Sequence, residues 1–287
     1  PLLTAFAPPE LSQPNSSARP RPLEVQVLEH AHGNPVHLYE RDCSFPRRHQ
    51  KLNEIAPSPQ LDETQRTWLG ETAVRAASAV GYENAGTVEF LMDRDGKFWF
   101  MEVNTRLQVE HTITEAITGI DIVQQQFRIA DGLPLEFSQA DIQKRGFAME
   151  FRINAEDPQN DFLPSYGRIT RYFAPGGPGV RTDAAIYTGY PIPPHYDSMC
   201  AKLVVWALDW PHLLNRAQRA LQDTGVFGVK TTIPYYLEIL KVDDFRLGIF
   251  DTGFVEAHPE LVKYRTSRPT RELTAAIAAA LATHHGF

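Results

Sequence analysis

Residues 87–104 read TVEFLMDRDGKFWFMEVN, two apolar runs around Asp-Arg-Asp-Gly. Aromatic and β-branched runs separated by Asp and Gly are typical of a β-hairpin. If residues 93–96 form a four-residue loop, Met92 pairs with Lys97 and the whole register of the hairpin follows from that pair. The sequence therefore predicts two antiparallel strands here.

In this register two carboxylates and an amide share one face of the hairpin. Directly paired residues point to the same side of a sheet, so Glu89, Glu102 and Asn104 point the same way, with Phe98 and Phe100 on that face as well. The two carboxylates become diagonal neighbours, with Cα atoms about 7–8 Å apart. Oxygen ligands of this kind suit Mg²⁺, which is usually held by one or two carboxylates together with substrate phosphates. The alternative is an ordinary polar face of an antiparallel sheet.

The chain continues Asn-Thr-Arg-Leu-Gln-Val-Glu-His to residue 111, with Arg106, Gln108 and Glu110 spaced two apart. In an extended segment these side chains project together beside the metal face. An arginine fork can bind an oxyanion such as bicarbonate or phosphate, and Glu110 can act as a general base. A surface charge ladder is the alternative.

Two further basic features stand out. Residues 47–51 read RRHQK, a cluster that can gather anionic charge or can be a solvated loop. Arg152 lies in an alternating apolar strand, and a semi-buried arginine needs a partner. Glu150 and Glu156 are the nearby candidates, and a structural ion pair with one of them is the alternative to a functional role.

The rest of the chain shows a mixed pattern. Residues 23–28 alternate like a strand with one buried face, residues 36–39 read as its hairpin partner, and residues 40–51 form a dense polar run. Proline-rich residues 1–21 predict an extended or disordered leader. Helical patterns with their caps and periodicity occur at residues 62–81, 112–131, 210–224, 233–240 and 270–283, the last of which we expect to dock on the body, and a domain change is expected at residues 135–147.

Composition limits the class of protein. The 287 residues carry a net charge of -7 and contain 43% hydrophobic residues, which is enough for a sizeable core. An acidic balance argues against nucleic-acid binding, and no apolar run is long enough to span a membrane. Cys43 and Cys200 are too few for a disulfide scaffold, so we expect a reducing, cytoplasmic location.

Several of these motifs together resemble biotin carboxylase, an ATP-grasp enzyme, and they follow its order from about residue 21 to residue 254. The residues that carry the resemblance are Glu40–Ser44 (ERDCS), Arg47–Lys51 (RRHQK), Glu102–His111 (EVNTRLQVEH), Arg152–Asp157 (RINAED), Phe162–Ser165 (FLPS), Ala174–Gly177 (APGG) and Tyr196–Met199 (YDSM). Residues 228–232 and the alanine-rich tail look most like the separate carboxylase subunit of pyruvate carboxylase.

The resemblance implies an α+β fold, with the second half of an ATP-grasp domain (22–133), the biotin carboxylase C-terminal domain (145–254) and a helical extension (255–287). It implies that ATP phosphorylates bicarbonate to carboxyphosphate, whose CO₂ is captured by biotin on a carrier protein. Such a component serves pyruvate carboxylase or acetyl-CoA carboxylase, the latter in fatty acid biosynthesis. The implied partners are ATP, bicarbonate, the biotin carboxyl carrier protein, a second copy of the chain and a carboxyltransferase subunit.

Residue by residue, the resemblance implies three sets of roles. Mg²⁺ or Mn²⁺ is bound by Glu89, Glu102 and Asn104, and ATP and biotin are contacted by His49, Glu89, Glu102 and Arg152. Bicarbonate is bound by Lys51, Arg106, Gln108, Val109 and Glu110, of which Lys51, Arg106 and Glu110 act in catalysis.

The sequence also departs from this family. A glycine-rich phosphate loop and two ATP-binding lysines normally precede the position of Leu23, and Pro22 and Pro46 replace a histidine and a glutamine of the family. Phosphoryl transfer depends on that positioning, so we expect the chain alone to be impaired. The alternative is a non-catalytic remnant that binds or dimerises. A metal hydrolase built on Glu89 and Glu102 ranks far behind, because the sequence offers no nucleophile for it.

Overall fold

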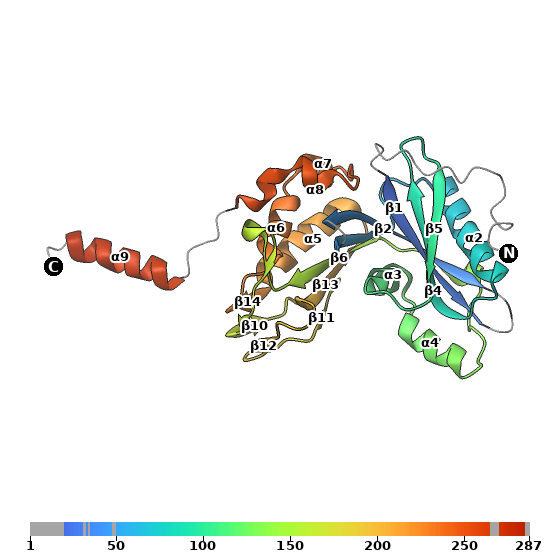
Figure 1. The fold of residues 1–287 in the computed structure, drawn as a ribbon, viewed down its shortest axis with the longest axis horizontal. Helices are drawn as coiled ribbons and strands as arrows, with labels where there is room; N and C mark the ends of the chain where they lie inside the picture. Colours follow the sequence, from blue (N-terminus) through green and yellow to red (C-terminus); the bar gives the residue numbers. More distant parts are fainter. Residues whose placement is uncertain (1–19, 31–32, 34, 48–49, 265–269, 285–287) are drawn as a thin grey trace.

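One antiparallel sheet of eight strands forms the centre of the molecule (Figure 1). The structure is a computed structural model that describes residues 20–30, 33, 35–47, 50–264 and 270–284. The strand order is β11-β13-β6-β3-β2-β1-β4-β5, with bounds β1 Arg21–Glu29, β2 Val36–Arg47, β3 Gln50–Ala56, β4 Asn84–Met92, β5 Phe98–Asn104, β6 Phe147–Asn154, β11 Val180–Ala184 and β13 Met199–Ala207.

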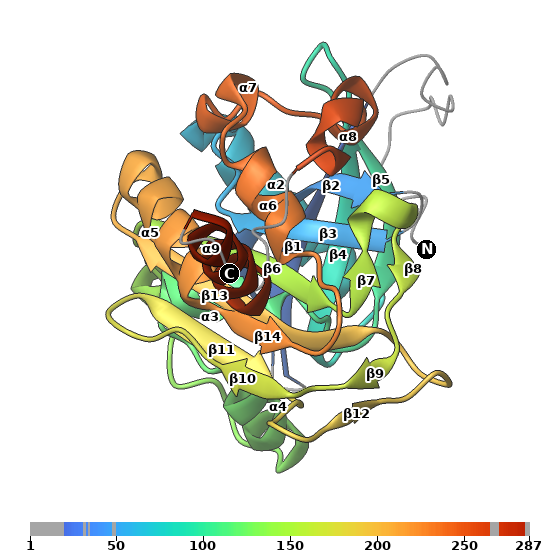
Figure 2. The ribbon, with the colours of Figure 1, turned by 90° about the vertical axis from the view of Figure 1, so that its left-hand side faces the viewer.

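Helices cover both faces of this sheet, and among the described residues six short strands form three separate two-stranded sheets, β10-β14, β12-β9 and β7-β8. Figure 2 shows β9, β10 and β12 together on the β11 side of the molecule. The helices are α2 Glu63–Ala79, α3 His111–Thr118, α4 Ile122–Ala130, α5 Trp210–Asp223, α6 Ile233–Ile239, α7 Asp243–Arg246, α8 Phe254–Ala257 and α9 Thr270–His284. The short strands are β7 Glu156–Asp157, β8 Leu163–Pro164, β9 Gly167–Arg168, β10 Arg171–Phe173, β12 Pro191–Ile192 and β14 Gly225–Phe227, and 3-10 turns lie at Gln139–Asp141, Pro158–Asn160 and Pro259–Val262.

Helix α2 confirms the helix predicted at residues 62–81. The Asp62 side chain accepts a hydrogen bond from the Gln65 backbone N–H, and the Gln65 side chain accepts one from the Asp62 backbone N–H, which satisfies two free N–H groups. The apolar stripe of α2 packs against the apolar face of β1 and β4 to form one core, made of Leu23, Val25, Val27, Leu69, Ala73, Ala76, Ala77, Val88 and Phe90. A second core lies between α5, α6 and strands β3, β6 and β13.

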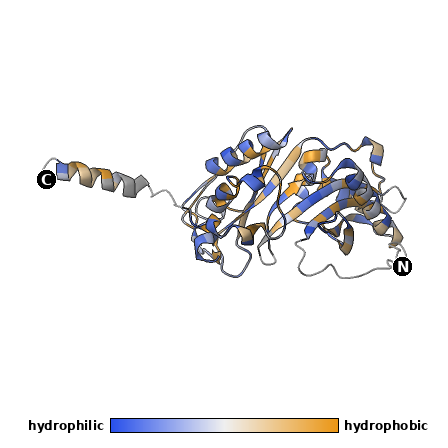
Figure 3. Cartoon of the chain, turned by 90° about the horizontal axis from the view of Figure 1, so that it is seen from above, coloured by the Kyte–Doolittle hydropathy of each residue, from blue (hydrophilic) through white to orange (hydrophobic). Residues whose placement is uncertain are grey.

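Strand β1 is buried on both faces, whereas its alternation predicted one. Glu24 and Gln26, on the face away from α2, are 1% and 0% exposed. Residues 40–47 and 50–51 of the polar run likewise belong to strands β2 and β3. Figure 3 shows polar and apolar residues alternating along the body. The polar side chains of β1 and β2 are buried because other charged side chains of the molecule cover them.

The hairpin forms as predicted, but its register differs. Met92 pairs with Phe98 and Phe90 with Phe100, so the loop has one residue more than predicted. A bulge at Met101 then adds a second residue, and Glu89 lies directly opposite Glu102. The extra loop residue and the bulge together shift the register by two, so Glu89 and Glu102 still share a face as predicted. Phe98 and Phe100 lie before the bulge, so for them only the one-residue shift applies and their face changes. Phe98 and Phe100 pack on the α2 side of the sheet, not beside the carboxylates as predicted.

The helical pattern at residues 112–131 is two helices rather than one. Gly119 takes a φ of 73°, which ends α3, and Asp121 caps α4 by accepting from the Gln124 backbone. Helix α3 lies on the sheet face opposite α5, because Ile113 and Ile117 pack against alternate residues of β6 and β13.

The sheet is continuous through the predicted domain change, because Asn53 to Ala56 of β3 pair with Phe151 to Ala148 of β6. The domain bounds themselves stay a prediction, and the predicted leader lies outside the described residues up to residue 19. Helix α9 stands apart from the body in Figure 1, against the expectation that it docks there. None of the helices in the described part of the chain combines the length and apolar character needed to cross a bilayer.

Candidate functional site

A row of charged side chains crosses the face of the sheet that is turned away from α2. Glu24 on β1 pairs in register with Arg41 on β2 and with Glu89 on β4, and Glu89 pairs with Glu102 on β5. Paired residues share a face. Leu23 and Val25 on either side of Glu24 point to α2. The row therefore lies on the side that carries α3.

Arg41 anchors the centre of this row, and its side chain has no solvent exposure. A guanidinium has five N–H donors, and each has an acceptor here. The acceptors are Glu24 Oε1 at 2.7 Å from Nε, Gln26 Oε1 and Thr114 Oγ1 at 2.9 Å from Nη1, and Gln108 Oε1 at 2.9 Å and Thr87 Oγ1 at 3.2 Å from Nη2. A complete set of acceptors stabilises the buried charge and fixes Gln108 beside the row.

Glu110 lies between two cations at the end of the loop that precedes α3. Its side chain is 4% exposed, and it contacts Lys51 Nζ through Oε1 and Arg152 Nη2 through Oε2 at 3.3 Å. Lys51 Nζ also lies 2.5 Å from Glu24 Oε2. The structure thus brings Lys51 from β3 and Glu110 from the β5–α3 loop, both predicted for the bicarbonate site, together with Arg152 from β6, which was predicted to contact ATP and biotin.

The electrostatics of this cluster follow from burial and charge. Burial opposes ionisation of Glu110, but Lys51, Arg41 and Arg152 outweigh it and lower its pKa to about 2. Burial opposes the charge of Lys51, but Cys43, Glu24 and Glu110 outweigh it and raise the pKa of Lys51. Burial likewise opposes the charge of Arg152, but Glu54 and Glu110 raise its pKa. Glu110, Lys51 and Arg152 are therefore charged at neutral pH, and two cations are positioned to receive an oxyanion.

The predicted metal ligands also meet. Asn104 Nδ2 donates to Glu89 Oε1 at 2.7 Å and to Glu102 Oε1 at 3.2 Å, and Gln108 Nε2 donates to Glu89 Oε1 at 3.0 Å. Burial raises the pKa of Glu89, and the neighbouring Glu24 and Glu102 raise it further. Two like charges held together beside an amide fit a hard cation, once the amide turns its oxygen inward.

The remaining predicted residues have different outcomes. The backbone oxygen of Val109 accepts from Lys202 Nζ at 2.9 Å, which fixes the loop. Arg106 is exposed and donates to the backbone oxygen of Leu107 at 3.3 Å, outside the Glu110 cluster. His49 lies outside the described residues.

Neither nearby candidate is the ion-pair partner of Arg152. Arg152 pairs with Glu54 on the neighbouring strand β3, at 2.8 Å from Nε and 2.5 Å from Nη2, and with Glu110. Glu150 and Glu156 are near Arg152 in sequence, but strand pairing brings Glu54 closer. This contact is one that no local pattern reports.

Sequence reasoning missed the residues that hold the predicted ones in place: Glu24, Arg41, Glu54 and Lys202. Glu24 and Lys202 are charged residues among apolar neighbours in their strands, and that is a signal that could have found them. Arg41 and Glu54 stand beside other polar residues and carry no such signal. The meaning of the signal depends on which strands are neighbours.

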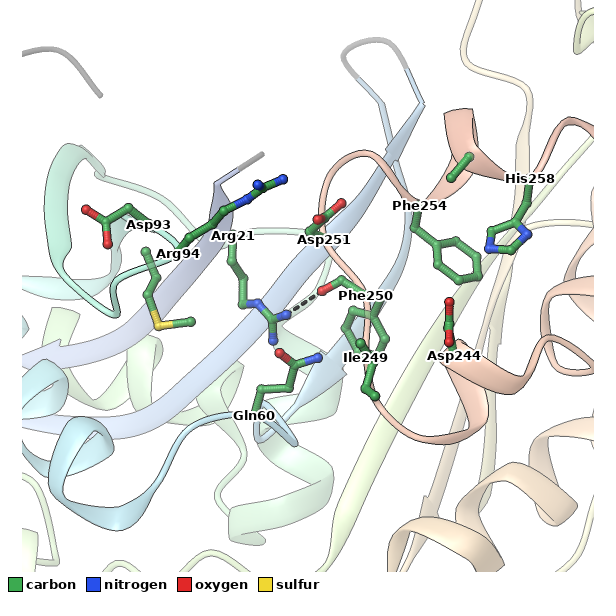
Figure 4. Close-up of a pocket in the computed structure, with 12 residues that line it drawn as sticks. Arg21, Gln60, Asp93, Arg94, Asp244, Ile249, Phe250, Asp251, Phe254 and His258 are labelled. Carbon is green, nitrogen blue, oxygen red and sulfur yellow. Dashed lines mark hydrogen bonds between the residues drawn. The ribbon is translucent and has the colours of Figure 1, made fainter. Parts of the chain in front are cut away.

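A separate hollow of about 380 Å³ lies between the β4–β5 hairpin loop and the segment around α7 and α8 (Figure 4). Arg21 donates to the backbone oxygen of Phe250 there and pairs with Asp42 at 3.3 Å. Its guanidinium joins the first strand to the C-terminal part of the chain. The predicted site residues do not line this hollow.

Comparison with known protein families gives one match in each part of the chain. Residues 3–138 match the family described as carbamoyl-phosphate synthase L chain, ATP binding domain, and residues 150–257 match the biotin carboxylase C-terminal domain. The first match begins inside the predicted leader.

The relatives are named carboxylases. The 2-oxoglutarate carboxylase small subunit of Hydrogenobacter thermophilus is 49% identical over 268 residues, which cover 93% of this chain and 57% of that protein. A pyruvate carboxylase subunit of Methanothermobacter thermautotrophicus is 51% identical over 255 residues, which cover 89% of this chain and 52% of that protein. The chain thus spans only about half the length of these relatives.

Solved structures agree. The biotin carboxylase domain dimer of Hydrogenobacter thermophilus 2-oxoglutarate carboxylase, crystallised with MgADP, ADP and bicarbonate, matches with a TM-score of 0.85 at 50% identity, over 86% of this chain and 55% of that one. The biotin carboxylase subunit of a pyruvate carboxylase gives a TM-score of 0.85 at 48% identity, over 86% of this chain and 55% of that one. The chain therefore belongs to the biotin carboxylase family of ligases and carries the second half of an ATP-grasp domain followed by the biotin carboxylase C-terminal domain.

Proposed function

We propose that this chain contributes the bicarbonate, metal and biotin side of a biotin carboxylase. In the proposed reaction an oxygen of bicarbonate attacks the γ-phosphorus of ATP and ADP leaves. The resulting carboxyphosphate breaks down to CO₂ and phosphate, and the CO₂ bonds to the ureido nitrogen of carrier-bound biotin, whose proton the phosphate takes up. The observation that supports this most directly is the convergence of Lys51, Arg152 and Glu110 in one buried cluster.

Glu110 is the proposed base, and its protein partners set its basicity. With its pKa near 2 it holds a proton poorly while both cations face it. An incoming bicarbonate competes for Lys51 and Arg152, which weakens their hold on the Glu110 carboxylate and makes it more basic. The carboxylate then accepts the bicarbonate proton while the two cations keep the anion in place. Arg106, exposed beside this cluster, is proposed to contact the substrate from the open side.

Glu89, Glu102 and Asn104 are proposed to hold Mg²⁺ or Mn²⁺, which neutralises phosphate charge when bound with ATP. All three side chains offer oxygen ligands. Burial and the neighbouring carboxylates Glu24 and Glu102 raise the pKa of Glu89, and a bound cation would offset that repulsion. Arg152 is proposed to reach biotin, and His49 the nucleotide.

The experiment measures ADP formation from Mg-ATP and bicarbonate, with and without free biotin. Because no glycine-rich phosphate loop occurs in these 287 residues, we expect the chain alone to give little ADP. Addition of the N-terminal half of a full-length relative should give biotin-stimulated turnover. Glu110→Gln should abolish that turnover, whereas Glu136→Gln, whose side chain is 67% exposed, should leave it unchanged.

Two results would contradict the proposal: a complemented enzyme without turnover, or turnover that does not depend on Glu110. Binding of bicarbonate without any turnover would favour the binding or dimerisation module. Turnover by the chain alone would show that the expected impairment is wrong.

We further propose that the carrier protein, a second copy of the chain and a carboxyltransferase subunit are its partners. The relatives, named subunits of carboxylases, support this. A reducing compartment such as the cytoplasm is supported by the two cysteines, both of which are buried and unpaired.

A further inference from the structure

Two buried glutamates that have no part in the proposed chemistry face each other beneath the site. Glu54 on β3 pairs directly with Glu150 on β6, and both side chains have no solvent exposure. They lie on the face that carries α3, because the paired alanines two residues away, Ala56 and Ala148, pack against that helix. Directly paired residues have Cβ atoms about 4.5–5.5 Å apart, so the two carboxyl groups are in reach of each other.

Each carboxyl group has one oxygen with a partner and one without. Glu54 Oε1 accepts from Arg152, and Glu150 Oε2 accepts from the hydroxyl of Thr112. Glu54 Oε2 and Glu150 Oε1 are buried and have no hydrogen-bond partner among the described residues. Unpaired buried acceptors are rare and destabilising. Two of them on directly facing residues point to one missing hydrogen atom between them.

Of the two glutamates, Glu54 has an ion-pair partner within 4.0 Å and Glu150 has none among the described residues. Glu54 has an ion pair with Arg152. For Glu150, no basic nitrogen in the described part of the chain lies within the 4.0 Å of an ion pair. The ammonium of Lys202 on β13 is turned to the backbone of Val109 at 2.9 Å and to Asp183 at 3.9 Å.

Other titratable groups face the pair from the elements around it. Glu110 from the loop before α3 adds negative charge, and Lys51 on β3 adds positive charge near Glu54. Cys43 on β2 is a buried thiol. From α6, Tyr236 donates to the backbone oxygens of Leu52 and Arg152 at 2.8 Å. The other cation of the cluster, Arg41, has all its donors engaged elsewhere.

We propose that Glu150 is a carboxylic acid at neutral pH and donates its proton to the Glu54 carboxylate, so that the pair carries one negative charge and positions Arg152. The hydrogen bond runs from Glu150 Oε1 to Glu54 Oε2 and satisfies both lone oxygens at once. Glu54 keeps its charge and holds Arg152 through Oε1, which directs the guanidinium toward Glu110.

Burial holds the pKa of both carboxyl groups above the ordinary value, so the pair keeps a proton at neutral pH. The ion pair of Glu54 with Arg152, not the order of the two pKa values, places that proton on Glu150. Burial raises the pKa of Glu54 to about 8, with Arg152 opposing it, and burial raises that of Glu150 to about 7, with Lys202 opposing it. These two values belong to the pair as a whole, because facing carboxyl groups titrate together. The single proton leaves only in mildly alkaline solution. A second negative charge then competes with Glu110 for Arg152, and this consequence for catalysis rests on the proposed function.

The test is infrared difference spectroscopy on the full chain, wild type against Glu150→Gln, at about pH 6.5. The wild type should show the carbonyl band of a protonated carboxylic acid, which Glu150→Gln removes and Glu136→Gln leaves. The Gln amide can donate to Glu54 in place of the acid proton, so the variant should fold.

Thermal unfolding gives a second, independent readout. A folded pKa above the unfolded value means that stability is complete in acid and is lost as pH rises through the folded value. Between about pH 6.5 and pH 9 the wild-type Tm should fall roughly 3 °C further than that of Glu150→Gln. Glu54→Gln, which removes the ion pair between Glu54 and Arg152, should be less stable than wild type throughout this range.

The proposal is overturned if the carboxylic acid band is absent from the wild type, if Glu150→Gln fails to fold, or if the two pH profiles of Tm coincide. None of these readouts depends on turnover. They would therefore separate a failure of the shared proton from a failure of the proposed carboxylase function. In the complemented enzyme, Glu150→Gln should also move the alkaline limb of kcat/KM to higher pH without changing its acid limb.

Discussion

Glu89 on β4 lies directly opposite Glu102 on β5, and the extra residue Met101 puts it there. Like charges directly opposite on paired strands destabilise a sheet. The amide of Asn104 offsets part of that repulsion by donating to both carboxylates. The facing carboxylates therefore reduce stability when no metal is bound and suit a bound cation. Both properties are expected of a metal site.

Replacing Glu89 should therefore separate stability from metal binding. Glu89→Gln should weaken Mn²⁺ binding, measured by calorimetry with ADP present, at least about 10-fold. Without metal it should stabilise the protein by about 0.5–1 kcal/mol. Since the pKa of Glu89 is raised, the wild type loses stability as pH rises through that value and the variant does not. Glu83→Gln, an exposed acid, is the control, and equal metal binding by both variants would argue against the site.

Deleting Met101 tests whether the metal ligands need the bulge itself. Without Met101, Glu102 follows Phe100 directly and still pairs with Glu89, because successive side chains point to opposite faces of a strand. We expect the deletion variant to keep Mn²⁺ binding, measured by calorimetry with ADP present, as should Met101→Ala at a position 50% exposed. Circular dichroism checks that the deletion variant is folded, and a folded deletion variant that has lost Mn²⁺ binding would contradict the register argument.

Arg41→Lys should destabilise the protein although it conserves charge. A lysine has at most three donors for the five acceptors that Arg41 satisfies, and each buried group left unpaired costs about 1–3 kcal/mol. We expect a loss of about 3 kcal/mol or more in the free energy of unfolding, measured by urea denaturation. Arg75→Lys, at a side chain 55% exposed, should change it little. Similar losses in the two variants would show that Arg41 is not the anchor of the row.

The stability contribution of Glu110 should be lost only in acid. Its pKa falls from an ordinary 4.5 to about 2, so its contribution is complete above about pH 4.5 and is lost as pH falls toward 2. Glu110→Gln should be less stable than wild type at neutral pH, with a gap that narrows in acid. Urea denaturation at several pH values measures this gap, and a gap that widens in acid would reverse the sign of the argument.

The sequence predicted much of this site because its local periodicity survives folding. The spacing of Arg106, Gln108 and Glu110 predicted side chains that project together; Gln108 and Glu110 are buried beside the charged row, whereas Arg106 is exposed outside it. The hairpin pattern predicted that the two carboxylates share a face, and they do. The register of that hairpin was wrong, because loop length and a bulge are set by packing of Phe98 and Phe100 against α2, which the sequence does not display locally.

Residues in ion pairs were predicted less well. Arg152 needed a partner, and the sequence offered its neighbours, but strand pairing supplied Glu54 from 98 residues away. Arg41 stood in a stretch that was predicted to be a polar run and turned out to be the buried centre of the sheet. A charged residue in an apolar strand indicates a buried ion pair without indicating where the partner is.

By itself, the sequence determined which elements form and which residue types carry the chemistry, since helix caps, alternation and motif spacing act over a few residues. Only the tertiary structure decided which charges meet: Lys51 and Arg152 on Glu110, Arg41 on Glu24, and Glu54 opposite Glu150. Strand order and register make those contacts, and they are fixed by burial of apolar faces summed over the whole sheet, a quantity that no short stretch of sequence contains.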